Sequence, residues 1–299
     1  MLNVLLYIAA TLIWGSTWLA IKLQLTQVPP ILSVGYRFCL AALILFLYCL
    51  LKRKRLAFSR QDHLFMALQG LTLFCLGYCG SYLSTKYLTS GLVAVVFSTV
   101  MMWNILNLKL FMAQPVDNKA FTGGLIGMVG ICVLFWHDLV AFRATSGLIG
   151  LSLALVGAYL ASVGNIVGSR NAKNKVPVTQ ANAYGMAYGG LMTVCIHFGF
   201  GGELIMDWSI GYLGPMLYLT LLGSIVAFGC YMLLIGRIGA DHAAYAMLLV
   251  PVLALILSTL FEDYHWYLSG VAGVILVLMG NLVLMKKSWV PLRALRRTT

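Results

Sequence analysis

Apolar residues along the chain gather into long segments that are separated by short polar stretches. Most segments have about 20 predominantly apolar residues, the length that a helix needs to cross the hydrocarbon core of a bilayer. They cover approximately residues 3–22, 31–51, 63–84, 89–110, 120–137, 147–168, 178–200, 212–235, 241–261 and 265–286. This pattern predicts an all-α membrane protein with ten transmembrane helices and no sizeable extramembrane domain.

Composition narrows the class of protein further. Of the 299 residues, 61% are hydrophobic and 9% are charged, whereas soluble domains are about 45–50% apolar and about 25% charged. A net charge of +12 would suggest nucleic acid for a soluble protein. Here the basic residues lie in short loops, where Lys and Arg fix membrane topology. We therefore expect the lipid bilayer as a partner, and no nucleic acid.

The basic residues also predict orientation. When successive loops are assigned to opposite sides, most Lys and Arg residues fall on one side; the loop after the second segment alone carries Lys52, Arg53, Lys54 and Arg55. Because cytoplasmic loops are enriched in Lys and Arg, we expect a multi-pass protein with both termini in the cytoplasm.

An internal repeat is visible at a shift of 150 residues. It pairs Gly123 with Gly273 and Gly130 with Gly280 in one register. The predicted units are a first five-helix repeat in residues 1–140 and a second in residues 141–299, which ends in a short basic tail. Because five spans are an odd number, the two copies enter the membrane in opposite orientations. Inverted repeats are typical of secondary transporters, whose substrate site lies near the midplane.

Four motifs, in order along the chain, resemble a known family. They are WGSTW at residues 14–18 followed by Pro29-Pro30 and Arg37, YLTSGLVAVVFSTV at residues 87–100, IGADHAAYAMLLVP at residues 238–251, and Gly273 with Gly280. Together they resemble the EamA-type carriers of the drug/metabolite transporter (DMT) superfamily over essentially the whole chain. The resemblance implies an export or exchange carrier for small metabolites, often amino acids, in a bacterial inner membrane.

Arg37 is the ionisable residue of most interest, because charged groups inside a membrane are costly and often functional. Its guanidinium could bind a substrate carboxylate in a fork geometry. Alternatively, Arg37 is structural: it extends toward the interface or bonds neighbouring helices and loops.

Aromatic and polar residues at helical spacing are further candidates for a substrate cavity. Aromatic walls accept apolar groups, and hydroxyl and amide groups bind polar ends. The alternative roles are interfacial aromatic belts and hydrogen bonds between helices. The predicted substrate-binding residues, besides Arg37, are Trp14, Ser16, Tyr78, Tyr82, Ser98, Trp103, Asn104, Tyr159, Asn165, Tyr184 and Tyr245.

Proline and glycine mark two mechanical features. Pro251 interrupts the ninth segment and predicts either a hinge for alternating access or a static bend. Glycines in the fifth and tenth segments fit close helix contacts. Those two helices are poor in polar groups, so they either support the core or form the contact of a homodimer.

No catalytic or cofactor motif accompanies these features. Beyond the pair Cys75 and Cys79, the seven cysteines lack metal-ligand spacing. P-loop and HExxH patterns are absent, and the acidic residues lie at segment ends or in loops. We therefore expect a non-enzymatic carrier without metal or cofactor.

The leading hypothesis is alternating-access export or exchange of a small metabolite, with amino acids as the first candidates. One alternative is efflux of drugs or quaternary ammonium compounds, which aromatic walls would bind through cation–π contacts. A further alternative is a membrane-embedded lipid-handling protein.

Overall fold

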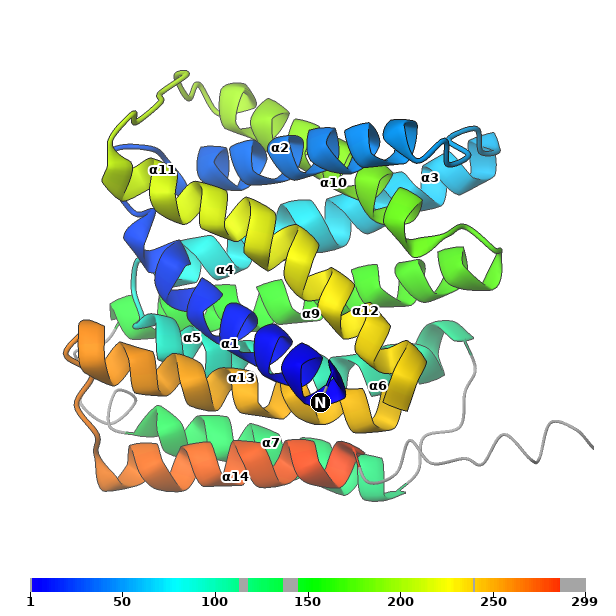
Figure 1. Cartoon of the computed structure of the whole chain (residues 1–299). Helices are drawn as coiled ribbons and strands as arrows, with labels where there is room; N and C mark the ends of the chain where they lie inside the picture. The colour runs from blue at the N-terminus through cyan, green and yellow to red at the C-terminus, as the bar shows by residue number, and fades with distance from the viewer. Residues whose placement is uncertain (1, 113–117, 137–144, 239, 286–299) are drawn as a thin grey trace, which may run out of the picture.

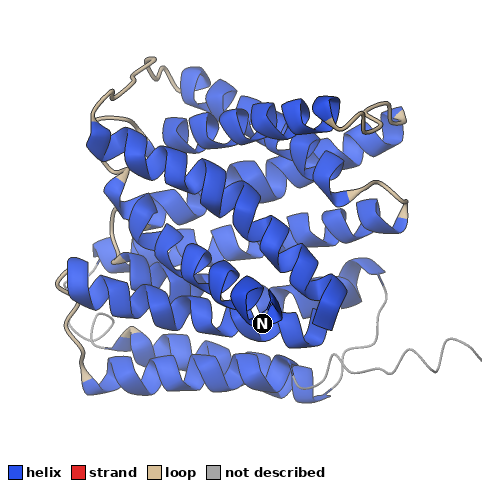
Figure 2. Cartoon of the chain, viewed as in Figure 1, coloured by secondary structure: helices blue, strands red, loops and turns tan. Residues whose placement is uncertain are grey.

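The computed structural model describes residues 2–112, 118–136, 145–238 and 240–285. Within these ranges the chain forms helices joined by short loops, with no strand (Figure 2). The helices are α1 (Leu2–Leu23), α2 (Pro30–Leu51), α3 (Arg60–Gln69), η1 (Gly70–Gly77), α4 (Tyr78–Ser84), α5 (Ser90–Phe97), α6 (Val100–Met112), α7 (Asn118–Leu134), α9 (Thr145–Lys173), α10 (Val178–Gly199), α11 (Ile210–Leu217), η2 (Tyr218–Val226), α12 (Ala227–Ile238), α13 (Ala240–Phe261) and α14 (Leu268–Met285).

Each predicted apolar segment coincides, to within a few residues, with one helix or with a run of consecutive helices. Six stretches are long and apolar enough to cross a membrane: Leu2–Leu23, Pro30–Leu51, Arg60–Ser84, Ser90–Met112, Ser146–Lys173 and Ile210–Leu234. Shorter apolar helices cover Thr122–Leu134, Ala246–Phe261 and Leu268–Val283. The predicted all-helical, multi-pass membrane protein is therefore confirmed.

Two of these spans change helix type at their centre. In α3–η1–α4 and in α11–η2–α12, the middle stretch is a π-helix, which has i→i+5 hydrogen bonds and occurs frequently at functional sites. η1 begins at Gly70 and η2 at Tyr218, close to the 150-residue shift that the sequence predicts. The same backbone irregularity thus occurs once in each half of the chain.

Helix starts recur at the same shift. Ser59 caps α3 and Ser209 caps α11, and each side chain accepts a hydrogen bond from the backbone N–H three residues further on. Pro29 precedes α2 with ψ 136°, and Pro177 precedes α10 with ψ 140°. Local backbone geometry therefore repeats along the chain, because the same types of residue stand at matching positions.

The helices are arranged in layers (Figure 1). α2 and α10 pack side by side at one edge, and α7 and α14 do so at the opposite edge, with α1, α9, α12 and α13 between them. Glycine permits both edge contacts: a Cβ atom at Gly190 would lie 2.8 Å from the backbone N of Cys39, and one at Gly273 would lie 2.5 Å from that of Leu134. The predicted close packing of the fifth and tenth segments is therefore a contact within the chain.

The connecting loops fall at two ends of the helices. Loops 24–29, 85–89, 200–209 and 262–267 lie at one end, on the left in Figure 1, and loops 52–59 and 174–177 lie at the other. We call these the α1–α2 end and the α2–α3 end. The basic loop residues Lys52 to Arg55 lie at the α2–α3 end together with Lys175, in keeping with the predicted one-sided distribution of charge.

Candidate functional site

Arg37 lies about two turns into α2 from the α1–α2 end, and its side chain is only 2% exposed. It therefore does not extend into solvent. Its Nε donates a hydrogen bond to Ser224 Oγ at 3.1 Å, and its Nη1 donates one to the Tyr82 hydroxyl at 3.3 Å. The guanidinium thus joins α2 and α4 of the first half of the chain to η2 of the second half.

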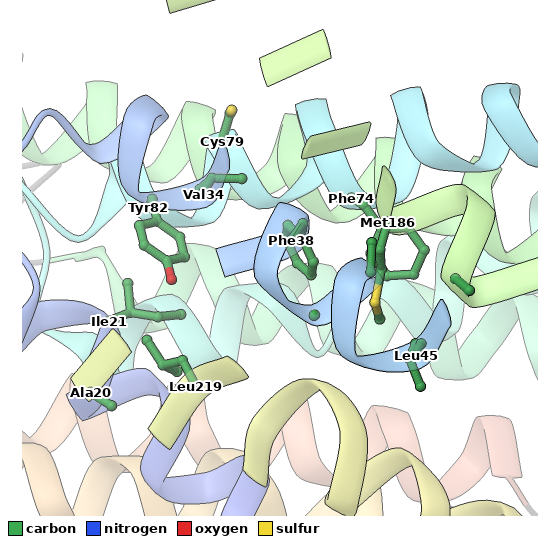
Figure 3. Close-up of a cluster of buried hydrophobic side chains, with 13 residues drawn as sticks. Ala20, Ile21, Val34, Phe38, Leu45, Phe74, Cys79, Tyr82, Met186 and Leu219 are labelled. Atoms are coloured by element: carbon green, nitrogen blue, oxygen red, sulfur yellow. The ribbon is translucent and has the colours of Figure 1, made fainter. Parts of the chain in front are cut away.

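Aromatic rings cover the guanidinium. Its Cζ lies 4.9 Å from the ring centroid of Tyr78 and 5.2 Å from that of Phe38, within the range of cation–π attraction. Tyr82 is fully buried and donates its hydroxyl hydrogen to Gln24 Oε1 at 2.9 Å. Figure 3 shows the Tyr82 hydroxyl directed toward Ile21 and Leu219, within the apolar cluster that surrounds this site.

Among the residues that the structure describes, no carboxylate pairs with Arg37. In the described ranges, the ion pair found joins Arg170 to Asp62 at 3.2 Å, and Arg37 has only neutral partners. A charge that is buried without a counter-ion carries a large desolvation cost. Among the described residues, neutral hydroxyl groups and aromatic rings therefore hold the Arg37 guanidinium.

The π-helical turn η2 presents the polar groups that face Arg37. Ser224 Oγ donates to the carbonyl of Leu219, five residues earlier, at 3.0 Å. Trp14 Nε1 donates to the Gly223 carbonyl at 3.1 Å. A Cβ atom at Gly223 would lie 3.3 Å from Arg37 Nη2, so glycine makes room for the guanidinium at this turn.

A second hydrogen bond links α1 to η2. Ser16 and Tyr218 share it, with a distance of 2.6 Å between their hydroxyl oxygens. We use the term Arg37 cluster for these connected side chains: Trp14, Ser16, Gln24, Arg37, Tyr78, Tyr82, Tyr218 and Ser224. The structure thus brings together five of the predicted site residues.

Four further predicted residues meet between α6 and α9. The rings of Trp103 and Tyr159 contact edge to face, with centroids 5.4 Å apart. Asn165 Nδ2 donates to Asn104 Oδ1 at 3.3 Å, and one turn away Asn107 bonds Ser162. Among the residues that the structure describes, the Trp103 indole N–H is buried without a hydrogen-bond partner.

The remaining predicted residues lie apart from both groups. Ser98, at the α5–α6 junction, accepts a hydrogen bond from Asn281 of α14 at 3.0 Å. The Tyr184 hydroxyl donates to the carbonyl of Leu56 at 2.8 Å and so ties α10 to the loop at the α2–α3 end. Pro251 is buried inside α13, and the side chain of Tyr245 lies outside the described residues.

Several members of the Arg37 cluster are absent from the predicted set. Gln24 follows the first apolar segment. Ser224 and Tyr218 belong to the π-helical turn, where Ser224 accepts a hydrogen bond from Arg37 and Tyr218 bonds Ser16. A helical period of 3.6 residues gives no signal for such a turn. The available signal is Ser224 itself, a polar residue inside an apolar segment.

The long apolar helices and their buried polar contacts define a multi-pass membrane protein. The model of the EamA-like transporter family matches residues 1–136 and residues 148–286. The chain belongs to the EamA-like transporter family, as the resemblance of its motifs implied.

Relatives agree with this membership. The chain is 28% identical over 276 residues to the uncharacterized transporter YoaV of Bacillus subtilis, covering 91% of this chain and 93% of the relative. It is 28% identical over 288 residues to the uncharacterized inner membrane transporter YedA of Escherichia coli K12, and the match covers 93% of this chain and 91% of that relative. It is 24% identical over 275 residues to protein PagO of Salmonella typhimurium, and the match covers 92% of this chain and 88% of that relative.

A solved crystal structure shares the fold. It superposes with a TM-score of 0.66 at 19% sequence identity, over 94% of this chain and 96% of the other. Family and relatives together point to a transporter.

Proposed function

We propose that the chain is a secondary carrier that exports or exchanges small metabolites, amino acids foremost, by alternating access. Its family and the names of its relatives support transport, and one relative is named an inner membrane transporter. We assign it to a bacterial inner membrane, with the α2–α3 end and both termini facing the cytoplasm, because Lys and Arg are enriched in cytoplasmic loops.

The proposed architecture is ten spans in two inverted repeats, residues 1–140 and 141–299. Family matches in both halves and the recurrence of a π-helical turn in each half support the repeat. Five spans per copy require opposite orientations, and a site between inverted copies suits alternating access. A homodimer remains a prediction for the outer faces of α7 and α14, where Leu125 and Ile275 are exposed.

The observation that carries the substrate class is the buried guanidinium of Arg37, which has no counter-ion in the described ranges. A substrate carboxylate would supply the missing counter-ion, and guanidinium pairs with carboxylate through two parallel hydrogen bonds. Tyr78, Tyr82, Trp14 and Ser16 would surround the rest of the solute with aromatic and hydroxyl groups.

The same charge argues against efflux of cationic drugs. A quaternary ammonium group would be repelled by Arg37, and cation–π contact with Tyr78 is already occupied by the guanidinium at 4.9 Å. A solute with a carboxylate is therefore the better match.

A flux measurement tests the proposal. Proteoliposomes containing the purified protein should accumulate radiolabelled amino acids above empty liposomes. Arg37→Gln should lower this flux by roughly 10- to 100-fold, because a hydrogen bond to a charged group contributes about 1.5–3 kcal/mol.

The matched control is Arg55→Gln, which removes an exposed arginine whose Nε donates to the Ala57 carbonyl at the loop surface. It should leave the flux unchanged. Absence of flux for every amino acid would reject the substrate class, and full flux in Arg37→Gln would reject the role of Arg37.

A further inference from the structure

A cavity of about 190 Å³ lies away from Arg37, between the α3–η1 junction, α9, α10 and α12. Its polar lining consists of three amide side chains, Gln69, Asn165 and Asn182. The rest of its lining is apolar or glycine: Leu73, Gly168, Ala172, Val176, Val178, Ala181, Phe228 and Met232. None of these described lining residues is ionisable. We call this space the amide cavity.

The amide cavity is adjacent to the loop at residues 174–177, at the α2–α3 end. Ala172 and Val178, which flank that loop, belong to its wall, and both are exposed. Gln69 lies at the last position of α3, a helix that starts at the same end. Arg37, by contrast, is near the start of α2 at the α1–α2 end.

The amides are held by one another and by their neighbours. Asn171 Nδ2 donates to Gln69 Oε1 at 3.0 Å, and Gln69 Nε2 donates to Asn182 Oδ1 at 3.4 Å. Arg170, bonded to Asp62, also donates to Asn171 Oδ1 at 3.3 Å. The Gln69 amide is therefore fixed on both sides.

Two hydrogen-bonding groups of the lining remain unused. Within the described part of the chain, Asn182 Nδ2 and Asn165 Oδ1 take part in no hydrogen bond, although the other atom of each amide does. The cavity thus offers one donor and one acceptor in an otherwise apolar lining. This combination suits a small solute group that both donates and accepts, such as a hydroxyl or a carboxamide.

An aromatic pair connects the amide cavity to the Arg37 cluster. Phe228 lines the cavity, and its ring contacts Trp14 edge to face with centroids 5.2 Å apart. Trp14 in turn bonds the Gly223 carbonyl, beside the serine that holds Arg37. The Trp14–Phe228 pair therefore stands between a neutral cavity and a cationic site.

We propose that the amide cavity is a second solute site, which binds an uncharged hydroxyl or carboxamide group of a solute entering from the cytoplasmic side. This inference rests on the proposed carrier function. It assigns Asn182 and Asn165 to recognition of the neutral polar group, and it separates that step from binding of a carboxylate at Arg37.

Initial rates measured from each face test the second site. L-threonine and L-valine are suitable probes because they have the same shape and differ by a hydroxyl in place of a methyl group. In inside-out vesicles, which expose the cytoplasmic face, wild type should have a KM for L-threonine about 3- to 10-fold below that for L-valine, the effect expected of one hydrogen bond.

Asn182→Ala should remove this preference in inside-out vesicles and leave the KM in right-side-out vesicles unchanged. Asn165→Ala, in α9 rather than α10, should also remove the preference. Agreement between the two variants shows that the effect does not come from a folding defect in one of them. The control is Gln180→Ala, an amide of the same helix that donates to the Arg55 carbonyl and does not line the cavity.

Two results would overturn the second site while leaving transport intact. One is the same preference for L-threonine over L-valine in Asn182→Ala, Asn165→Ala and wild type. The other is a change in KM that is equal from both faces. If wild type moved no amino acid at all, the proposed substrate class itself would be wrong. The two failures are therefore distinguishable.

Discussion

The two π-helical turns share a backbone irregularity but differ in what surrounds them. The two glycines at the ends of η1 lie against backbone atoms of other helices: a Cβ atom at Gly70 would lie 2.5 Å from the carbonyl oxygen of Gly185, and one at Gly77 would lie 3.3 Å from the backbone N of Ala161. Around η2 the neighbours are polar side chains, with Arg37 bonded to Ser224.

The comparison indicates how a fold with a repeated backbone turn acquires a polar site at only one of the two turns. The backbone turn occurs in both halves, and side-chain chemistry then assigns it a role. In η1 small residues allow α9 and α10 to approach closely, whereas in η2 the turn directs a hydroxyl and a carbonyl group toward α1 and α2. We expect η1 to govern folding and η2 to govern solute affinity.

The largest expected effect is on folding, in η1. Gly70→Ala places a methyl group against backbone atoms of α10, which cannot move aside as a side chain can, so we expect a destabilisation of about 1–3 kcal/mol. The midpoint of thermal unfolding in detergent should fall clearly.

Gly229→Ala is the matched control, because a Cβ atom there would have no neighbour within 4 Å. It follows η2 within α12 and should keep or raise the unfolding midpoint, since alanine favours helix by about 1 kcal/mol over glycine. Equal midpoints of thermal unfolding for Gly70→Ala and Gly229→Ala would contradict the packing role of η1.

A smaller effect, on affinity, is expected in η2. Ser224→Ala deletes the hydroxyl that accepts from Arg37 Nε, and the KM of the carrier for amino acids should rise by about 10-fold through loss of a charge-assisted hydrogen bond. Flux kinetics in proteoliposomes measure this change.

Thr220→Val serves as the control within η2. The Thr220 hydroxyl is buried and, in the described part of the chain, has no hydrogen-bond partner, so its removal should leave KM unchanged. Similar KM values for Ser224→Ala and Thr220→Val would contradict the assignment of Ser224.

The smallest effect is expected from the link between α1 and η2. Tyr218→Phe removes the hydrogen bond to Ser16, and a neutral, part-buried bond of this kind contributes about 0.5–1.5 kcal/mol. The lower end of this range corresponds to the roughly two- to threefold change in KM that we expect. Thr72→Val in η1 removes a hydroxyl that donates to the Leu68 carbonyl one turn earlier in the same span, and it should give no change in KM. An equal change in KM for both variants would contradict the difference between the two π-helical turns.

The sequence predicted much of the fold for a simple reason. Segment length alone identifies helices that can span a bilayer, and Ser and Pro at helix starts have local roles that do not depend on tertiary structure. Arg37, Tyr82 and Trp14 were identifiable because polar and aromatic groups stand out in apolar segments.

The rest of the site depends on geometry that the sequence does not reveal. A π-helical turn changes the register of the residues that follow it, so the faces of Tyr218 and Ser224 cannot be assigned from a 3.6-residue period. Gln24 follows α1 in a loop. Tyr184 has the same polar-aromatic character as Tyr82, yet it bonds the Leu56 carbonyl in a loop, and only the tertiary structure separates the two.

A double-mutant cycle tests most directly whether Arg37 binds a carboxylate. It compares the best-transported amino acid and its carboxamide derivative in wild type and in Arg37→Gln, using kcat/KM from proteoliposome flux. We predict that wild type prefers the carboxylate by roughly 10- to 100-fold and that the preference falls to nearly one in Arg37→Gln. The same preference in both proteins would contradict the account.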